Sequence, residues 1–333
     1  MIRRPGIVLA LWLAAVPAAP AVADGGEEWL QRMGDALNNA SYVGEFITES
    51  TGRTERLSIV HRVRDGVVSE RLVSLSGNGR ELVRENDEVV VYLPDQKLAI
   101  IERRPGRSDL MGALPQFTGE MSTWYKVDYV GREATIFGPT AVVAVRPLDG
   151  YRFGYRLWID LDSHMPVRSD LSDAAGRVVE RLQFTKLKFD KDIPDSAFEP
   201  ALDRSKLRWV RQSPQADDEA PAWRAAQVPP GFRLSVSGMQ AVAGTSAPVS
   251  HLVYSDGLAS VSVFIHAPTP GKAPVLGSGR SGVASAFSTV VDGHQVTVVG
   301  EVPPRTLKFI ATGLRPATTA APATPTSARE RGD

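Results

Sequence analysis

The sequence of 333 residues contains no cysteine, which excludes disulfide bonds, cysteine–zinc sites and cysteine nucleophiles. Its 38 basic residues balance 38 acidic ones, so no net charge draws the whole chain toward nucleic acid or anionic lipid. Long apolar runs are lacking after the first 23 residues, so no later segment is predicted to cross a bilayer. The length suggests about two domains, each large enough to bury an apolar core.

Motifs that carry chemistry are also missing. The five histidines, at positions 61, 164, 251, 266 and 294, show no metal-ligand spacing, and no Gly-x-Ser-x-Gly elbow of a serine hydrolase is present. The run Gly277–Gly282 matches a dinucleotide-binding glycine pattern but lacks a βαβ context, which favours a flexible Gly/Ser loop. We therefore predict no catalytic residue, no metal ion, no cofactor and no nucleic-acid partner.

The N-terminus has the pattern of a cleavable secretory signal over residues 1–23. Arg3 and Arg4 precede the apolar run 7–16, and small residues lead to Ala21-Val22-Ala23. Ten apolar residues span only about 15 Å as a helix, roughly half the hydrocarbon core of a bilayer. We expect an exported protein, and the lack of cysteine suits an oxidising compartment such as the periplasm.

Beyond the signal, one amphipathic helix is followed by many short strands. Apolar residues at helical spacing predict a helix over 27–40. Short β-branched or aromatic segments separated by Gly, Asn, Asp or Pro predict strands at 42–48, 55–64, 67–75, 80–85, 88–93, 97–102, 177–189, 258–266 and 295–302. This order indicates an α+β fold that is mostly β, with antiparallel meanders.

The clearest alternation lies between residues 151 and 160. Tyr151, Phe153, Tyr155, Leu157 and Ile159 would share one face, and Arg152, Arg156, Trp158 and Asp160 the other. Alternation of this kind predicts one buried and one partly wet face.

Composition divides the mature chain into two folded parts. We expect a first domain at 24–200, a linker at 201–227 and a smaller β-rich domain at 228–314. Residues 315–333 are mostly Pro, Ala, Thr and Ser, which predicts a disordered tail.

Two groups of motifs resemble one family. The stretches Tyr254–Ile265 and Val296–Thr306 resemble the C-terminal domain of the MucB/RseB family. The early helix, Trp158–Asp162 leading to Met165-Pro166, and Ile193–Phe198 resemble its lipoprotein-carrier-like N-terminal domain. The resemblance covers about residues 27–314, with the motifs in the family's order.

The resemblance implies a periplasmic negative regulator of the sigma-E envelope stress response. Members bind the periplasmic region of a membrane-spanning anti-sigma factor of the RseA/MucA kind and shield it from regulated proteolysis. Lipopolysaccharide or mislocalised lipoprotein is thought to release that grip. The implied fold is a LolA/LolB-like, unclosed antiparallel β-barrel wrapped on helices, plus a smaller β-rich domain. The family is not enzymatic, and the oligomeric state stays open, a homo-oligomer included.

Site residues are predicted for both ligands. Aromatic and apolar side chains on the strands of the first domain are candidates for the lipid cavity or its rim: Tyr92, Leu93, Trp124, Tyr125, Phe153, Tyr155 and Trp158. Candidates for partner contact in the smaller domain are Tyr254, Asp256, Phe264, Glu301 and Thr306. Ordinary core packing competes with the first assignment, and turn chemistry at Ser255-Asp256-Gly257 with the second.

Two alternative functions stay open at this point. A periplasmic lipoprotein or lipid carrier would suit the first domain alone but leaves the second unexplained. A hydrolase of envelope polymers would need a His or Asp centre that no motif here supplies.

Overall fold

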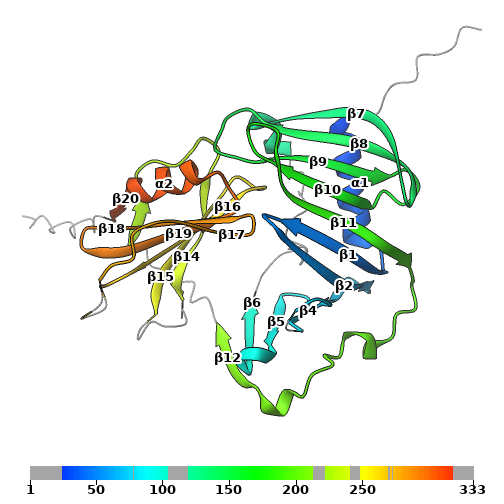
Figure 1. Cartoon of the computed structure of the whole chain (residues 1–333), viewed down its shortest axis with the longest axis horizontal. Coiled ribbons are helices and arrows are strands. Elements are labelled where there is room, and N and C mark those ends of the chain that lie inside the picture. Colours follow the sequence, from blue (N-terminus) through cyan, green and yellow to red (C-terminus); the bar gives the residue numbers. More distant parts are fainter. Residues whose placement is uncertain are drawn as a thin grey trace, which may run out of the picture.

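The computed structural model describes residues 25–77, 79–103, 119–212, 222–240, 248–268, 271 and 273–317. The predicted signal at 1–23 and most of the predicted tail, from 318 onward, lie outside these residues. Figure 1 shows a larger unit, formed by residues 25–212, beside a smaller unit, formed by residues 222–317. Within the described residues no helix is both long and apolar enough to cross a membrane.

The larger unit is built on one sheet of twelve strands. In chain order these are β1 (Tyr42–Ser50), β2 (Arg53–Arg64), β3 (Val67–Ser74), β4 (Glu81–Glu85), β5 (Glu88–Leu93), β6 (Leu98–Arg103), β7 (Tyr125–Thr135), β8 (Gly138–Pro147), β9 (Gly154–Asp160), β10 (Pro166–Ser172), β11 (Val178–Phe189) and β12 (Arg208–Gln212). The spatial order is β12-β6-β5-β4-β3-β2-β1-β11-β10-β9-β8-β7, antiparallel except for β12 beside β6. Strands β12 and β7 lie at the two ends of this order and do not pair with each other, so the predicted mostly-β class and unclosed antiparallel sheet are confirmed.

Two-residue turns set the register of several hairpins. The turns Thr51-Gly52 and Asp65-Gly66 have positive φ at both positions, between 45° and 79°. This conformation matches the right-handed twist of the paired strands, and glycine adopts it without steric cost. The strands predicted on either side of these turns are confirmed within a few residues.

Helix α1 (Gly26–Asn39) fills the curved sheet from inside. Trp29, Leu30 and Met33 form its buried stripe and pack with side chains of the surrounding strands in the main core. Gly26 touches β7 so closely that a Cβ would lie 2.9 Å from the backbone of Asp128. The helix predicted at 27–40 is therefore confirmed, and glycine at its start permits the close contact.

The segment after β11 is held against the outer face of β2–β4. Arg62, buried on β2, donates to the carbonyl of Ile193 at 2.8 Å and pairs with Asp195 at 2.6 Å. Short 3₁₀ helices punctuate this segment and other connections: η1 (Pro94–Gln96), η2 (Gly119–Thr123), η3 (Asp195–Phe198) and η4 (Arg204–Lys206). The range 201–227, predicted as a linker, thus contains η4, β12 and a further strand, β13 (Trp223–Ala225).

The predicted wet face of residues 152–160 is covered in two places. Strand β9 begins only at Gly154, so Arg152 does not follow its alternation and is fully buried. Trp158 is 4% exposed, because its indole N–H donates to Glu133 at 2.7 Å and the Arg168 guanidinium lies 4.0 Å over its ring. The prediction of a partly wet face therefore fails at these two positions. Polar side chains of β7 and β10 cover Trp158, and Trp124, Phe232 and Asp256 cover Arg152.

The smaller unit contains a six-stranded sheet, a helix and a two-stranded ribbon. Its further strands are β14 (Arg233–Gln240), β15 (Val249–Ser255), β16 (Ser260–His266), β17 (Gly277–Ser281), β18 (Ala284–Val291), β19 (His294–Gly300) and β20 (Leu314–Pro316). The order is β14-β15-β16-β19-β18-β17, with β13 paired to β20. Helix α2 (Pro304–Gly313) packs on β18 and β19 (Figure 1).

Helix α2 was not predicted, although its signals are present. Pro304 occupies the first turn, where a missing N–H costs nothing. Leu307, Ile310 and Ala311 follow at helical spacing and are completely buried. The expected Gly/Ser loop at 277–282 was also wrong, because residues 277–281 form the edge strand β17.

Phe184 tests the packing of the larger unit. It is fully buried on β11, 5.5 Å from the ring of Phe46, and a Cβ on Gly44 would lie only 2.7 Å from it. We expect Phe184→Ala to lower the free energy of unfolding by about 3 to 5 kcal/mol, measured by urea denaturation, because it opens a cavity in the core. The matched control is Phe189→Ala on the same strand, where the ring is 46% exposed and the loss should be far smaller. Equal losses would contradict this account of the core.

Candidate functional site

A buried arginine joins the two units. The Arg152 side chain is 0% exposed, and its Nε donates to Asp256 Oδ2 of the smaller unit at 2.5 Å. Its other nitrogens donate to the Asp149 carboxylate and to the carbonyl of Pro230. The Tyr125 hydroxyl donates to the same Asp256 oxygen at 3.0 Å. We call these five residues the joint.

Aromatic rings enclose the joint. The Arg152 guanidinium lies 5.0–5.6 Å from the ring centroids of Trp124, Tyr125 and Phe232, within the range of cation–π attraction. Gly231 has a φ of 84°, and a Cβ there would lie 2.5 Å from the Trp124 ring. Burial alone would lower the pKa of Arg152, but the hydrogen bond and charge of Asp256 outweigh it and raise that pKa.

Asp256 holds its own turn as well as the joint. Its Oδ1 accepts the backbone N–H groups of Leu258 and Ala259, at 2.9 and 2.7 Å, while Oδ2 faces Arg152 and Tyr125. Burial and the negative charge of Asp256 both raise the pKa of the Tyr125 hydroxyl, which therefore stays protonated as a donor. One carboxylate thus couples the shape of a loop in the smaller unit to a strand of the larger.

The start of helix α2 adds a second contact beside the joint. Thr306 Oγ1 donates to the carbonyl of Tyr151 at 2.7 Å, and the Arg305 guanidinium donates to the carbonyl of Gly150. The Phe309 ring packs on Tyr151 with centroids 5.4 Å apart. Two parts of the smaller unit therefore contact the 149–152 loop: the segments that carry Pro230 and Asp256, and the start of helix α2.

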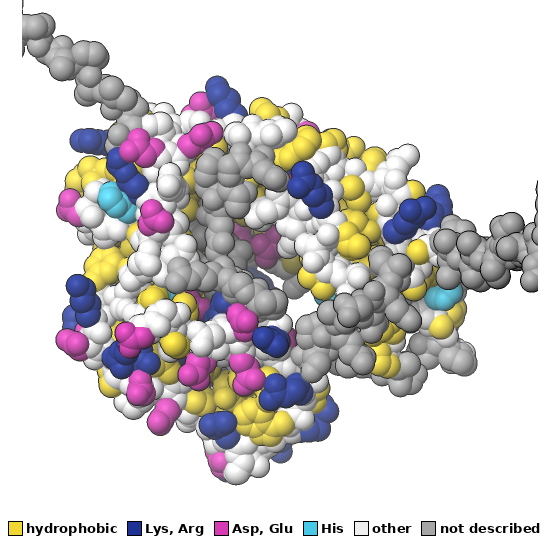
Figure 2. Space-filling model, turned by 180° about the vertical axis from the view of Figure 1, so that it is seen from behind, with side chains coloured by type: hydrophobic (Ala, Val, Ile, Leu, Met, Phe, Trp, Pro, Cys, Tyr) yellow, Lys and Arg dark blue, Asp and Glu magenta, His cyan; other side chains and the backbone are white. Residues whose placement is uncertain are grey.

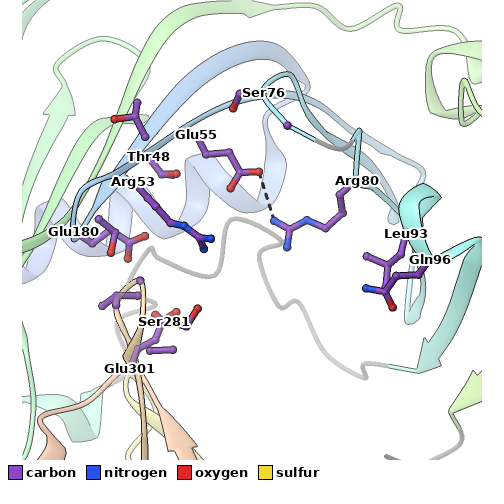
Figure 3. A pocket seen from close by; sticks show the side chains of 16 residues that line it. Thr48, Arg53, Glu55, Ser76, Arg80, Leu93, Gln96, Glu180, Ser281 and Glu301 are labelled. Atoms are coloured by element: carbon purple, nitrogen blue, oxygen red, sulfur yellow. Dashed lines mark ion pairs between the residues drawn. The ribbon is translucent and has the colours of Figure 1, made fainter. Parts of the chain in front are cut away.

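A polar cavity of about 680 Å³ opens between the units, away from the joint. Figure 2 shows the hollow near the centre of the molecule, with acidic side chains in its depth. Arg53 and Arg80 reach into it from the larger unit, and Arg80 pairs with Glu55 at 3.8 Å (Figure 3). Glu180 of β11 and Glu301 of the smaller unit lie together on another side of it (Figure 3).

The β17–β18 hairpin closes the cavity on the side of the smaller unit. Val283, which lies in the turn of this hairpin, packs with Phe153 and Leu171 of the larger unit. Thr51 Oγ1 donates to the carbonyl of Gly282 at 3.0 Å. These contacts are few and mostly neutral, in contrast to the charged joint.

An apolar row crosses the part of the large sheet next to the cavity. Leu72, Leu82, Val91 and Ile100 are cross-strand neighbours on β3, β4, β5 and β6, and all four are half-buried. Leu72 touches the main core, which places the row on the inner face of the sheet. Leu93, two residues beyond Val91, lines the cavity. We call these five side chains the inner row.

The residues predicted for a lipid cavity fall into two groups. Leu93 lines the cavity between the units. The other six pack against the chain's own side chains: Tyr92, Trp124, Tyr125, Phe153, Tyr155 and Trp158. Within this second group, Trp124 and Tyr125 meet at the joint.

The residues predicted for partner contact lie in three places. Asp256 and Thr306 make contacts between the units, and Glu301 lines the cavity. Tyr254 is buried, and its hydroxyl oxygen accepts the N–H of Ala225 at 2.7 Å. Phe264 stacks on His251, with ring centroids 4.6 Å apart.

Sequence reasoning missed Arg152 and Glu180. Asp149, three residues before Arg152, was the only partner close in sequence, since the rings of Trp124, Tyr125 and Phe232 and the carboxylate of Asp256 come from distant segments. No signal near Glu180 indicated an unusual environment. The described residues include no group of three or more His, Asp or Glu side chains able to hold a metal ion.

Asp256→Asn tests the joint. Asparagine keeps the Oδ1 acceptor for Leu258 and Ala259 but removes the charge that faces Arg152. We expect the free energy of unfolding to fall by about 3 kcal/mol in urea titrations, because a buried guanidinium loses the buried one of its two carboxylate partners and keeps only Asp149. Asp173→Asn is the matched control: Asp173 also accepts backbone N–H groups through Oδ1 and an arginine through Oδ2, but that arginine, Arg177, is 81% exposed. If the free energy of unfolding falls equally little in both variants, the joint stabilises the fold no more than a surface ion pair does.

The chain was compared with known families and structures. The model of the MucB/RseB N-terminal domain matches residues 25–202, and that of the MucB/RseB C-terminal domain matches residues 217–315. The sigma factor AlgU regulatory protein MucB of Pseudomonas aeruginosa is 35% identical over 319 residues, covering 91% of this chain and 94% of that protein. The sigma-E factor regulatory protein RseB of Escherichia coli K12 is 27% identical over 303 residues, covering 91% and 92%.

A solved structure matches both units together. The complex of Pseudomonas aeruginosa MucA and MucB contains a chain that aligns with a TM-score of 0.70 at 30% identity, covering 88% of this chain and 99% of that chain. The match extends over both domain models, in agreement with the resemblance in the sequence motifs. The chain belongs to the MucB/RseB family.

Proposed function

We propose that this chain is a periplasmic negative regulator of a sigma-E-type envelope stress response. It binds the periplasmic region of a membrane-spanning anti-sigma factor and protects that region from proteolysis. The observation that carries the proposal is the alignment of both units with MucB crystallised in complex with MucA(peri), at a TM-score of 0.70 over 88% of this chain. The predicted signal at 1–23 supports export to the periplasm.

The arrangement of the units suits an extended polypeptide. Strand β17 ends the smaller sheet, so among the described strands its outer side pairs with none, and Ser281 places its end at the cavity. An unpaired edge offers backbone donors and acceptors in the spacing that an added strand requires. Charges of both signs line the cavity, which lets a local match replace the net charge that the chain lacks.

The inner row is the proposed contact for an acylated ligand. Its five aliphatic side chains run from the main core to the cavity, and each buried methylene of a ligand contributes roughly 0.8 kcal/mol. Lipopolysaccharide or an acylated lipoprotein that binds a partner-free arrangement more tightly than the clamped one would shift the balance by that difference in affinity. Release then needs no covalent step.

Protection from proteolysis is the direct test. The periplasmic segment of the anti-sigma factor is incubated with the protease that begins its degradation, with and without this protein. We expect cleavage to slow at least tenfold at saturating protein, since a bound segment cannot enter a protease site. A segment of the same composition in scrambled order is the control, and it should be cleaved at an unchanged rate. Cleavage of the authentic segment at an unchanged rate would defeat the proposal.

Val91→Glu tests the proposed role of the inner row in release. A carboxylate in the row should repel an acyl chain, so we expect protection to persist but its reversal by lipopolysaccharide or by a triacylated peptide to be lost. Val90→Glu is the control, because the adjacent valine is equally half-buried but faces the opposite side of β5. Reversal that is unchanged in Val91→Glu would remove the row from the mechanism. Comparison of the two amphiphiles separates a lipopolysaccharide response from a lipoprotein response.

A lipid or lipoprotein carrier is the second candidate, favoured by the inner row alone. It would extract acylated protein from membranes in the absence of any anti-sigma factor. A pull-down from membrane vesicles distinguishes the two functions, because a regulator needs no net extraction.

A further inference from the structure

Two glutamates, one from each unit, lie beside the β17–β18 hairpin, where few contacts join the units. Glu180 lies on β11, between Ser50 of β1 and Leu171 of β10 in the sheet. Glu301 directly follows β19. Both line the cavity on the side of the β17–β18 hairpin (Figure 3). Glu301 is open to the water of the cavity, although protein surrounds its carboxyl on most sides, whereas Glu180 is half-buried.

The cations around the cavity do not pair with these carboxyls. Arg80 lies 3.8 Å from Glu55, and Arg280 of β17 is exposed to solvent. Arg53 lines the same cavity, yet in the described part of the chain no cation lies within 4.0 Å of Glu180 or Glu301. The two negative charges therefore face one another without a counter-ion at ion-pair distance.

The remaining ionisable groups nearby are occupied or neutral. Arg181, next to Glu180, points to the other face of β11 and pairs with Asp170 at 2.8 Å. Tyr155 of β9 is half-buried and packs against the Val283 cluster. Burial, followed by the charge of Glu301, raises the pKa of its phenol, which stays protonated. Asp256 is held by Arg152 at 2.5 Å. Among the described residues, none of these groups cancels the repulsion between Glu180 and Glu301.

Attraction at this side of the interface is slight. Within the part of the chain that the structure describes, one hydrogen bond, from Thr51 to the carbonyl of Gly282, and one small apolar cluster around Val283 hold the hairpin to the larger unit. The charged joint lies at the other end, where it can act as a pivot. A change of two charges beside the hairpin therefore acts against few contacts.

We propose that Glu180 and Glu301 form an acid-dependent latch, which lets the units close on the β17–β18 hairpin when protonated and opens the cavity by repulsion when both are ionised. The latch is a property of this chain alone and goes beyond the proposed binding of an anti-sigma factor.

The direction of the pH dependence follows from where a proton binds more tightly. Burial, and then the charge of Glu301, raise the pKa of Glu180 from its ordinary 4.5 to about 7, and burial raises the pKa of Glu301. Since the closed arrangement holds the proton more tightly than an open one, its stabilisation is complete below pH 4.5 and is lost as the pH rises through about 7. The two carboxyls titrate as a coupled pair, so the transition is broad.

The test measures a distance across the cavity. The chain has no cysteine, so Gln96→Cys and Ser278→Cys, at exposed positions on opposite units, accept two spin labels without competing sites. We expect the mean label distance to lengthen between about pH 5 and about pH 8, with a midpoint near 7. With Glu180→Gln and Glu301→Gln added, the distance should stay short throughout, because amides carry no charge at any pH in this range.

Glu49→Gln is the matched control. Glu49 lies on β1 beside Ser50 and is 55% exposed, and it does not line the cavity. Its substitution removes one negative charge, as each glutamine of the latch variant does, so the midpoint of the distance change with pH should persist. Circular dichroism at both pH limits shows whether each variant is folded, and small-angle scattering of the unlabelled protein gives a second measure of opening. A pH profile that is the same with and without the two glutamines, or a constant distance in the unsubstituted pair, overturns the latch. Neither result bears on anti-sigma binding, which the experiment does not involve.

Discussion

The arrangement of the two units depends on the ion pair between Arg152 and Asp256. Both side chains are fully buried, so their attraction acts in a medium of low dielectric constant while their hydration is lost. A pair of this kind adds little net stability compared with an apolar contact, but it tolerates few geometries. Asp149, Pro230 and Tyr125 satisfy the remaining hydrogen-bonding groups around it. The joint therefore determines orientation more than affinity, and the shape of the cavity follows from that orientation.

Contacts between the two units are numerous at the joint and few at the β17–β18 hairpin. Interfaces between domains of one chain commonly permit relative motion unless they are large and apolar. Here the joint and the α2 contact hold the 149–152 loop, whereas the hairpin side has one hydrogen bond and the Val283 cluster. A rotation about the joint would widen the cavity without breaking the buried ion pair. Motion of this kind changes the walls that a bound polypeptide would touch while both cores stay intact.

The inner row gives a lipid a route to the same motion, and its energy can be bounded. Moving a two-state balance from 1:99 to 99:1 requires about 5.5 kcal/mol of differential affinity. At roughly 0.8 kcal/mol per methylene, this corresponds to about seven methylenes that are buried in one arrangement and not in the other. One acyl chain is long enough, provided that the sheet opens space beside Leu82 and Val91 only in the released arrangement. The requirement is a difference between states, so tight binding of lipid to both would achieve nothing.

Local signals predicted helix α1 and the strands β1 to β6, β9, β11, β16 and β19, whereas β7, β8, β10 and most elements of the smaller unit were not predicted individually. Long-range contacts escaped local signals altogether. Asp65-Gly66 predicts a tight hairpin because its two positions must adopt positive φ, and the strands on either side follow. Strand β12 was missed because its partner, β6, lies about a hundred residues earlier, and β17 because its Gly-Ser composition has no strand propensity of its own. Arg152 was placed on a partly wet face because Asp256, the fully buried acid that pairs with it, is 104 residues away. The family motifs identified Asp256 and Thr306 as important, but only the structure shows that both face the larger unit.

The placement of charge along the interface has a mechanical consequence. At the joint, Arg152 lies between the carboxylates of Asp256 and Asp149 and pairs with both, so each acid there has a cation in contact. At the hairpin, Glu180 and Glu301 have no counter-ion within ion-pair distance among the described residues, and the same displacement that separates them also releases Val283. Repulsion applied far from a pivot produces more opening than the same repulsion applied next to it. Lipid in the inner row and ionisation beside the hairpin would then act on one coordinate, the angle about Arg152, and their effects would add as free energies.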